Sequence, residues 1–352
     1  MLDMIPHEAL PEELLTFRSS IRRFVERELM PYEPQLGPDG LLEESITQKL
    51  RERARAAGLW LLDVPEELGG QGLSLLPLAV FWEEVGRTTV ASMARDHGIF
   101  GPMIGPILLG LTEEQRQRYL YPVIEGKKRY CFAQTEPDAG SDPSAMRTRA
   151  VRTANGYRIN GVKRFITRAG KADFAIVMAL TDPERRARGG ISCFIVDMDS
   201  PGVRLGGPER TVTGDQPWEI VFEDVEVPFE NLVGEEGQGF ALAQHYINHG
   251  RIRQGAHAMG AAERCLSLNT RYALQRKTFG EYLAQRQGVQ WMLADAFTEV
   301  YATRLMVYDA ARKIDAGIDA RMETFMIKTF GVELGYKVVD MCMQLHGGLG
   351  LT

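Results

Sequence analysis

The sequence contains little cysteine: four residues in a chain of 352. Cys131, Cys193, Cys265 and Cys342 are widely separated among apolar neighbours, and no two of them have the spacing of a metal or redox motif. We therefore expect four reduced core thiols rather than a disulfide framework. Reduced thiols are typical of a reducing compartment, so the expected location is the cytoplasm.

Long apolar runs and an excess of positive charge are also absent. No apolar run approaches the ~20 residues that a membrane-spanning helix needs. Residues 1–10 include Asp3 and Glu8 but no arginine, so we expect neither a signal peptide nor a transit peptide. The chain has 41 Lys and Arg against 47 Asp and Glu, a net charge of −6. This balance argues against nucleic-acid binding, which usually needs a basic surface, but permits a local site for an anion.

The hydrophobic pattern divides the chain into three parts, which its length allows. Up to residue 127, apolar residues recur at helical spacing, and Thr112 with Gln115 forms a helix-capping signature. Residues 128–240 read as strands, with a hairpin at Asn155-Gly156 and buried strands over 174–180, 191–196 and 220–227. We predict domains at 1–127, 128–240 and 241–352.

The last part returns to helical spacing. Six residues in it recur at steps of three and four, a stripe that predicts the core face of a helix bundle: Trp291, Ala294, Thr298, Tyr301, Leu305 and Tyr308. His245, His249, Arg253 and His257 also share one predicted helical face. Two histidines at this spacing can bind zinc, but no third ligand is evident, so we expect packing or ligand contact and no metal site.

The segment from Tyr130 to Asp142 carries the strongest chemical signal. It begins as a short strand and breaks at Pro137 and Gly140 into a loop with small hydroxyl side chains. Such a loop allows close approach of the backbone to a ligand. A second strand-like piece, 165–167, pairs a phenylalanine with a threonine. Backbone amides, hydroxyls and an aromatic ring suit a flat heterocycle with polar edges.

These segments resemble those of the acyl-CoA dehydrogenase family. The resemblance covers 133–142, 222–234, 276–280 with Gln287, and 344–348, in the order of the family. It implies an α+β, mainly helical fold with an N-terminal helical domain, a middle β-barrel-like domain and a C-terminal four-helix bundle. It also implies FAD as cofactor, an acyl-CoA thioester as substrate, and an electron-transfer flavoprotein as the electron-accepting partner.

Two sets of residues are implied as FAD contacts. The resemblance places one set at the flavin and diphosphate of the chain's own FAD: Phe132, Gln134, Thr135, Ser141, Phe165 and Thr167. Of these, Thr135 and the Gln134 amide would lie at the N1 edge of the flavin, Thr167 near N5, and Phe165 against the ring. It places a second set at the FAD of a neighbouring subunit: Arg276, Phe279, Gln287, Gln344, Gly347 and Gly348. The protein is therefore expected to be a homo-oligomer, a dimer or tetramer, with shared FAD sites.

The substrate contacts implied by the resemblance are Ser141 and Arg251. One branch of the family takes its catalytic base from a glutamate next to this arginine, but here the preceding residue is Gly250. In most of the family the base follows the glycine pair, so we expect the catalytic carboxylate beyond Thr352. Two alternatives stay open. The chain could be a non-catalytic subunit that binds flavin or CoA, or an oxidase that uses oxygen on the same fold.

Overall fold

The computed structural model describes residues 10–91, 98–212 and 214–352. The chain forms two compact units, one of residues 1–37, 41–99 and 248–352 and another of 38–40 and 100–247. Each is described by itself. Asp3 and Glu8, on which the expected absence of a leader rests, lie outside the described residues. The division into three domains stays a prediction.

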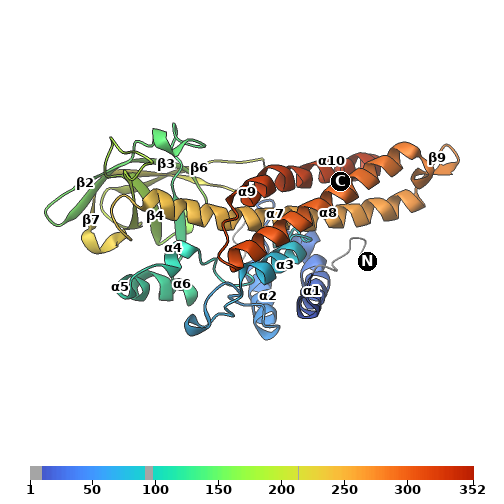
Figure 1. The fold of residues 1–352 in the computed structure, drawn as a ribbon, viewed down its shortest axis with the longest axis horizontal. Coiled ribbons are helices and arrows are strands. Elements are labelled where there is room, and N and C mark those ends of the chain that lie inside the picture. The colour runs from blue at the N-terminus through green and yellow to red at the C-terminus, as the bar shows by residue number, and fades with distance from the viewer. Residues whose placement is uncertain (1–9, 92–97, 213) are drawn as a thin grey trace. The chain divides into compact units, whose positions relative to one another are not determined.

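The N-terminal helices of the first unit are α1 (Glu12–Phe24), α2 (Glu44–Ala56) and α3 (Leu75–Val85) (Figure 1). Helix α1 buries Ile21 and Phe24, as its apolar spacing predicts, and also Arg18. A side chain that is distant in the sequence caps the N-terminus of α3. The Asp315 carboxylate accepts hydrogen bonds from the backbone N–H groups of Leu75 and Leu76, at 2.7 and 2.9 Å. A carboxylate at this end satisfies N–H groups that have no partner within the helix.

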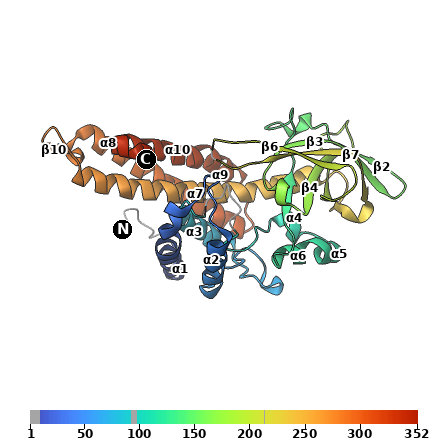
Figure 2. The same ribbon diagram turned by 180° about the vertical axis from the view of Figure 1, so that it is seen from behind.

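The C-terminal helices of this unit are residues 248–275 of α7 (Gly239–Gln275), α8 (Gln287–Asp315), α9 (Arg321–Met326) and α10 (Val332–His346). Figures 1 and 2 show α8 and α10 side by side. Small residues let the helices approach closely. A Cβ atom at Gly260 would lie 1.9 Å from the Glu83 carbonyl oxygen, and one at Gly335 would lie 3.0 Å from the Ala258 Cβ. Two short strands, β9 (Lys277–Thr278) and β10 (Glu281–Tyr282), form a hairpin between α7 and α8.

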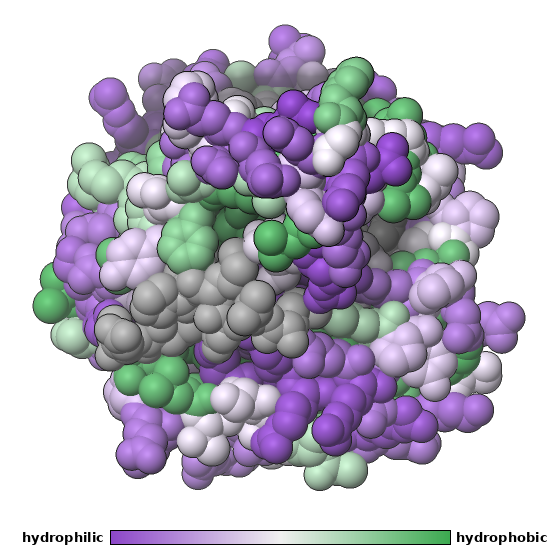
Figure 3. All heavy atoms as spheres, turned by 90° about the vertical axis from the view of Figure 1, so that its right-hand side faces the viewer, coloured by the Kyte–Doolittle hydropathy of each residue, from purple (hydrophilic) through white to green (hydrophobic). Residues whose placement is uncertain are grey.

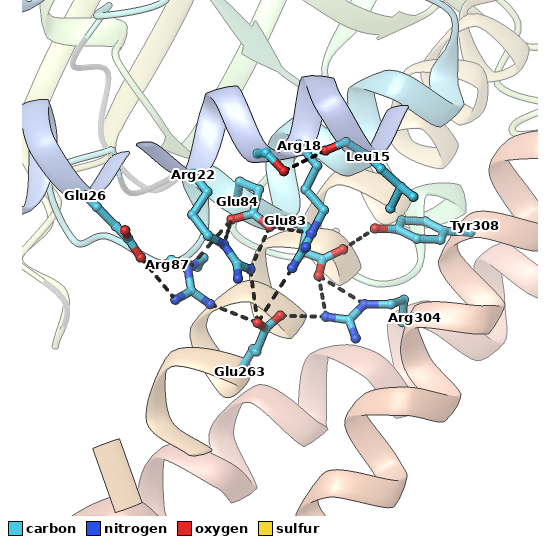
Figure 4. Close-up of polar contacts among 11 residues, drawn as sticks. Leu15, Arg18, Arg22, Glu26, Glu83, Glu84, Arg87, Glu263, Arg304 and Tyr308 are labelled. Atoms are coloured by element: carbon cyan, nitrogen blue, oxygen red, sulfur yellow. Dashed lines mark hydrogen bonds and ion pairs between the residues drawn. The ribbon is translucent and has the colours of Figure 1, made fainter. Parts of the chain in front are cut away.

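A buried cluster of charged side chains joins α1, α3, α7 and α8 (Figure 4). Glu84 of α3 binds Arg18 and Arg22 of α1, each at 2.8 Å. Glu263 of α7 binds Arg304 of α8 at 2.6 Å. Removing one member of such a cluster leaves uncompensated charge away from water, so the cluster fixes the relative positions of these four helices.

The predicted core stripe on α8 is wrong, except at one residue. Tyr308 is buried, but Trp291 and Leu305 are 62% and 42% exposed. The buried face of α8 carries smaller residues instead: Ala296, Val300, Thr303, Val307, Ala310 and Ala311. Both the predicted stripe and the buried residues recur at steps of three and four, because they occupy two adjacent faces of the same helix. The larger apolar residues lie on the exposed face. In the described part of the chain, this helix therefore presents an apolar surface to solvent.

The second unit is built on a sheet of eight strands within the described residues, in the order β6-β7-β3-β2-β4-β5-β8 with β1 beside β4. The strands are β1 (Tyr130–Ala133), β2 (Arg149–Arg152), β3 (Gly156–Ile166), β4 (Phe174–Leu180), β5 (Ile191–Asp197), β6 (Val203–Pro208), β7 (Trp218–Pro228) and β8 (Leu232–Val233). The predicted strands and the hairpin that joins β2 to β3 are confirmed. β4 and β5 are buried as predicted, whereas β7 alternates between buried and exposed residues. Ile159, Val177, Phe194 and Phe222 lie in the core of the sheet.

Short helices precede the sheet: α4 (Pro106–Leu109), α5 (Glu113–Gln115) and α6 (Tyr121–Ile124). The predicted cap of α5 is confirmed, because the backbone N–H of Gln115 donates to Thr112 Oγ1 and the Gln115 side chain accepts from the Thr112 N–H. The Gln115 amide also donates to the carbonyl oxygens of Glu230 and Leu232, each at 2.8 Å. The predicted fold class is confirmed: an N-terminal helical region, a middle β region and a C-terminal helical region.

Candidate flavin site

The loop after β1 lies against the end of β3. The Arg164 N–H of β3 donates a hydrogen bond to the Thr135 carbonyl oxygen at 2.9 Å. The Lys163 ammonium group donates to the Gln134 carbonyl oxygen at 3.0 Å. These bonds bring the segment of Gln134 and Thr135 beside the strand end that leads to Thr167. The two hydroxyl-bearing segments found in the sequence therefore meet in one place in the fold.

A buried ion pair stabilises this loop. Lys163 Nζ lies 2.8 Å from Glu136 Oε1, and both side chains are almost fully buried. Glu136 also accepts hydrogen bonds from the backbone N–H groups of Arg147 and Thr148, at 2.6 and 3.0 Å. Burial lowers the pKa of Lys163 to about 8, opposed by the adjacent carboxylate. For Glu136, burial acts to raise the pKa, but Lys163 and the hydrogen bonds from Thr148 and Arg147 together outweigh it and hold the pKa below its usual value.

Sequence reasoning missed this pair. The signal was present, because Glu136 is inside the matched loop and Lys163 occupies an inward position of a strand that alternates between buried and exposed residues. A lysine at such a position needs a buried partner. Lys163 is therefore a positioning residue, which fixes the backbone of the loop rather than facing a ligand.

Several groups of the loop region remain open to a ligand. Phe165 is 52% exposed and has a left-handed backbone, with φ of 57°. Thr167 and Ser141 are exposed as well. The Gln134 side-chain oxygen is buried without a hydrogen-bond partner in the structure. Phe132 packs against the ring of Tyr246, with centroids 4.9 Å apart. An exposed ring, hydroxyls and an unused acceptor form a surface that suits a planar polar heterocycle.

The six residues predicted to reach a neighbouring subunit lie in the other unit. Arg276, Phe279 and Gln287 surround the β9–β10 hairpin, where Phe279 is 99% exposed. Gln344, Gly347 and Gly348 lie at the exposed C-terminal end of α10. The rings of Tyr272 and His346 stack at 4.3 Å, which brings the two groups to the same end of the helical unit. Figure 3 views the molecule from the side of the hairpin and shows separate apolar groups among polar ones.

Arg251 also lies in the helical unit. Its guanidinium donates a hydrogen bond to Asn248 at 2.5 Å and lies 4.9 Å from the centre of the Phe325 ring. At Gly250 an added Cβ would meet no atom within 4 Å, so this position has open space beside Arg251. Ser141 and Arg251, the two predicted substrate contacts, belong to different units.

The histidine face of α7 has packing contacts. The rings of His249 and Trp82 lie edge to face, 5.6 Å apart, and the backbone of His257 lies against Gly86. Across residues 10–91, 98–212 and 214–352, no three His, Cys, Asp or Glu side chains are placed to hold a metal ion. Over the same ranges, no helix is both long enough and apolar enough to cross a membrane.

Comparison with known proteins identifies the class of this fold. Models of the acyl-CoA dehydrogenase N-terminal, middle and C-terminal domains match residues 11–127, 131–225 and 237–352. The chain belongs to the acyl-CoA dehydrogenase family, whose members are oxidoreductases that act on acyl-CoA thioesters.

Three relatives illustrate the range of this family. The chain is 38% identical to the caffeyl-CoA reductase-Etf complex subunit CarC of Acetobacterium woodii, over 88% of this chain and 82% of that protein. Its fold matches the crystal structure of acyl-CoA dehydrogenase from Geobacillus kaustophilus with a TM-score of 0.84 and 33% identity, covering 98% and 90% of the two chains. It also matches the FAD complex of PigA with a TM-score of 0.86 and 27% identity, covering 97% and 89%.

FAD is the cofactor of this family. The loop that follows β1, residues 134–142, is called the flavin loop below, and together with the strand end at residues 165–167 it fits this cofactor. The exposed Phe165 ring and the hydroxyls of Thr167 and Ser141 are available for stacking and polar contacts, and the buried Gln134 side-chain oxygen has no donor. When bound, FAD supplies a two-electron acceptor that the protein side chains themselves do not provide.

Proposed function

We propose that this protein catalyses the α,β-dehydrogenation of an acyl-CoA thioester to the trans-2-enoyl-CoA, with FAD as cofactor, and passes the electrons to an electron-transfer flavoprotein. The observation that carries the proposal is the flavin loop, in which Thr135 and the strand end before Thr167 are joined by a backbone hydrogen bond. The relation to an Etf-complex subunit supports the proposed electron acceptor.

The proposed work of the chain's own residues begins at the loop. Hydrogen-bond donors at the N1 edge of a flavin stabilise the negative charge that develops there on reduction. We assign this role to the Thr135 hydroxyl and the Gln134 N–H. Thr167 would donate toward the N5 edge, and Phe165 would exclude water from one face. Ser141 would contact both the diphosphate of FAD and the CoA thioester.

The helical unit supplies the proposed contacts to the adenylate end of FAD and to CoA. Arg276 offers a planar cation for phosphate oxygens, and Gly347 and Gly348 allow close backbone approach. Arg251 is the proposed recognition group for the acyl-CoA. The catalytic carboxylate is not assigned to any residue of the described ranges.

We further propose a homo-oligomer in which one protomer contacts the FAD of its partner. The support is an apolar surface on the helical unit. Trp291, Tyr301 and Leu305 of α8 are exposed, and Tyr336 of α10 is 78% exposed. Such surfaces are uncommon on monomers and typical of obligate interfaces. Light scattering of the purified holoprotein should give at least a dimer, and a monomer at micromolar concentration would contradict this part of the proposal.

The test of the activity uses protein expressed from the complete gene. It should purify with bound FAD, and under anaerobic conditions an acyl-CoA panel should bleach the flavin. Dye reduction by at least one thioester then measures turnover and reports the preferred chain length. Bound FAD without bleaching by any thioester would favour the non-catalytic subunit. Rapid peroxide formation in air would favour the oxidase.

A further inference from the structure

Two of the four cysteines, predicted to be reduced core thiols, are brought together by the fold. Cys265 lies on α7 and Cys342 on α10, and the two side chains interact. Cys342 Sγ also lies 3.8 Å from the Cys265 carbonyl oxygen. Both residues are half-buried, whereas Cys131 and Cys193 are buried in the sheet unit. The predicted core position is confirmed for Cys131 and Cys193 and is wrong for the half-buried Cys265 and Cys342.

The two helices hold the thiols in a defined register. Ala258 and Gly335 lie about two helical turns before the two cysteines, and at this level the helices touch with only small residues between them. The same step along both helices keeps Cys265 opposite Cys342. Because a disulfide requires closely spaced and favourably oriented Cβ atoms, a pair already in contact needs little backbone movement to form one.

A histidine is fixed beside the more exposed thiol. His346 Nδ1 lies 3.8 Å from Cys342 Sγ and 2.9 Å from the Cys342 carbonyl oxygen. Stacking on Tyr272 restricts the imidazole ring. A ring N–H that points toward the carbonyl also faces the sulfur, where it stabilises a thiolate.

The surroundings make the two thiols chemically unequal. The hydrogen bond from Cys265, with support from His346, lowers the pKa of Cys342 to about 7. The same hydrogen bond raises the pKa of Cys265. Burial raises the pKa of Cys131 to about 12. Cys342 therefore has the properties of an attacking thiolate, and Cys265 those of a thiol that resolves the first oxidation product.

We propose that Cys342 and Cys265 form a redox-sensitive dithiol, which hydroperoxides oxidise to a disulfide between α7 and α10. The Cys342 thiolate attacks one oxygen of hydrogen peroxide, the O–O bond breaks, and a sulfenic acid and hydroxide form. The hydroxide takes up from solvent the proton that the Cys342 thiol released, which gives one water. Cys265 sulfur then attacks the Cys342 sulfur, the S–O bond breaks, and a second water leaves with the Cys265 proton. Two thiols lose two electrons, and one peroxide is reduced to two waters.

The position of the dithiol connects it with the proposed function. Cys342 lies just before Gln344, Gly347 and Gly348, which are predicted to contact the FAD of a neighbouring subunit. Under the proposed function, reduced flavin that reacts with oxygen supplies hydrogen peroxide. The dithiol chemistry itself does not depend on dehydrogenase activity, so it can be tested separately.

The experiment uses the holoprotein with its cysteines in the thiol form and treats it with a small excess of hydrogen peroxide at neutral pH. Catalase then stops the reaction, and the denatured protein is alkylated and mapped by mass spectrometry. We expect Cys265 and Cys342 to lose reactivity together and to appear as one linked peptide pair that dithiothreitol releases. Cys131 and Cys193 should stay fully alkylated and serve as internal controls.

Variants separate the two steps. In Cys265→Ser, peroxide should give a sulfenic acid at Cys342 that dimedone traps, and no linked pair. In Cys342→Ser, Cys265 should stay reduced under the same conditions. Wild-type protein in which both thiols survive peroxide, or in which Cys342 oxidises to sulfinic acid as readily as in Cys265→Ser, would overturn the proposal. The wild-type measurement decides the matter even if a variant fails to fold.

Discussion

Replacing Lys163 with methionine should destabilise the sheet unit and loosen the flavin loop. The substitution preserves most of the side-chain volume but removes the charge that pairs with buried Glu136 and the donor to the Gln134 carbonyl oxygen. Removal of one partner from a buried ion pair typically costs ~3–5 kcal/mol, because the remaining charge is left away from water. At ~2–4 °C per kcal/mol for a unit of this size, the unfolding midpoint should fall by roughly 6–20 °C.

The assay is calorimetry at saturating FAD, together with the flavin content after gel filtration. Arg158→Met is a matched control on the same strand, since Arg158 pairs with Glu226 at 2.7 Å but both side chains are at least half exposed. Exposed pairs contribute little, so this variant should unfold close to wild type and keep its FAD.

The double variant Lys163→Met with Glu136→Gln isolates the effect of uncompensated charge. In the wild type the Arg147 and Thr148 N–H groups donate to different oxygens of Glu136, and the single amide oxygen of glutamine can still accept from one of them. The double variant should therefore recover part of the lost stability. The reasoning would be refuted if Lys163→Met unfolded within about a degree or two of the Arg158→Met control. It would also be refuted if adding Glu136→Gln lowered the unfolding midpoint of Lys163→Met further instead of raising it.

Three further predictions concern the helical unit. Gly250→Ala should raise the free energy of unfolding by about 0.4–1 kcal/mol, since the new Cβ meets open space within a helix. Gly260→Ala should lower the unfolding midpoint, because its Cβ would strike a carbonyl oxygen. Equal effects of the two substitutions would contradict the close helix packing at Gly260. Iodoacetamide should alkylate Cys342 with a rate that rises through pH 7, where its thiolate forms. Cys265→Ala removes the hydrogen bond that stabilises the thiolate and should move that midpoint to higher pH; an unchanged midpoint would exclude this cause. Phe279→Ala should weaken FAD retention without lowering the unfolding midpoint of the apoprotein, because the ring is almost fully exposed.

Local patterns predicted much of the fold. The cap at Thr112, the hairpin at Asn155-Gly156 and the strand over 174–180 each depend on a few consecutive residues, and all three are present in the structure. The predicted core stripe on α8 failed because helical spacing does not say which apolar face is covered. That choice depends on small residues contributed by other helices, such as Gly331 against Thr303 and Gly255 against Val307 of α8.

The same limit applies to the candidate sites. Matched motifs predicted the candidate flavin loop, but the side chains that hold it become evident only in the tertiary structure. Lys163 and Glu136 are separated along the chain, and their pairing depends on the register between the loop and β3. Cys265 and Cys342 are farther apart still, and no sequence spacing marks two residues that meet only through helix packing.

The most direct test of the proposed function is anaerobic titration of the FAD-loaded, full-gene protein with acyl-CoA thioesters, followed by absorbance of the flavin. The account predicts bleaching by at least one saturated thioester, formation of the matching enoyl-CoA in equal amount, and loss of this response in Thr135→Val with Thr167→Val. A protein that binds no FAD, or a double threonine variant that is reduced as fast as wild type, would contradict it.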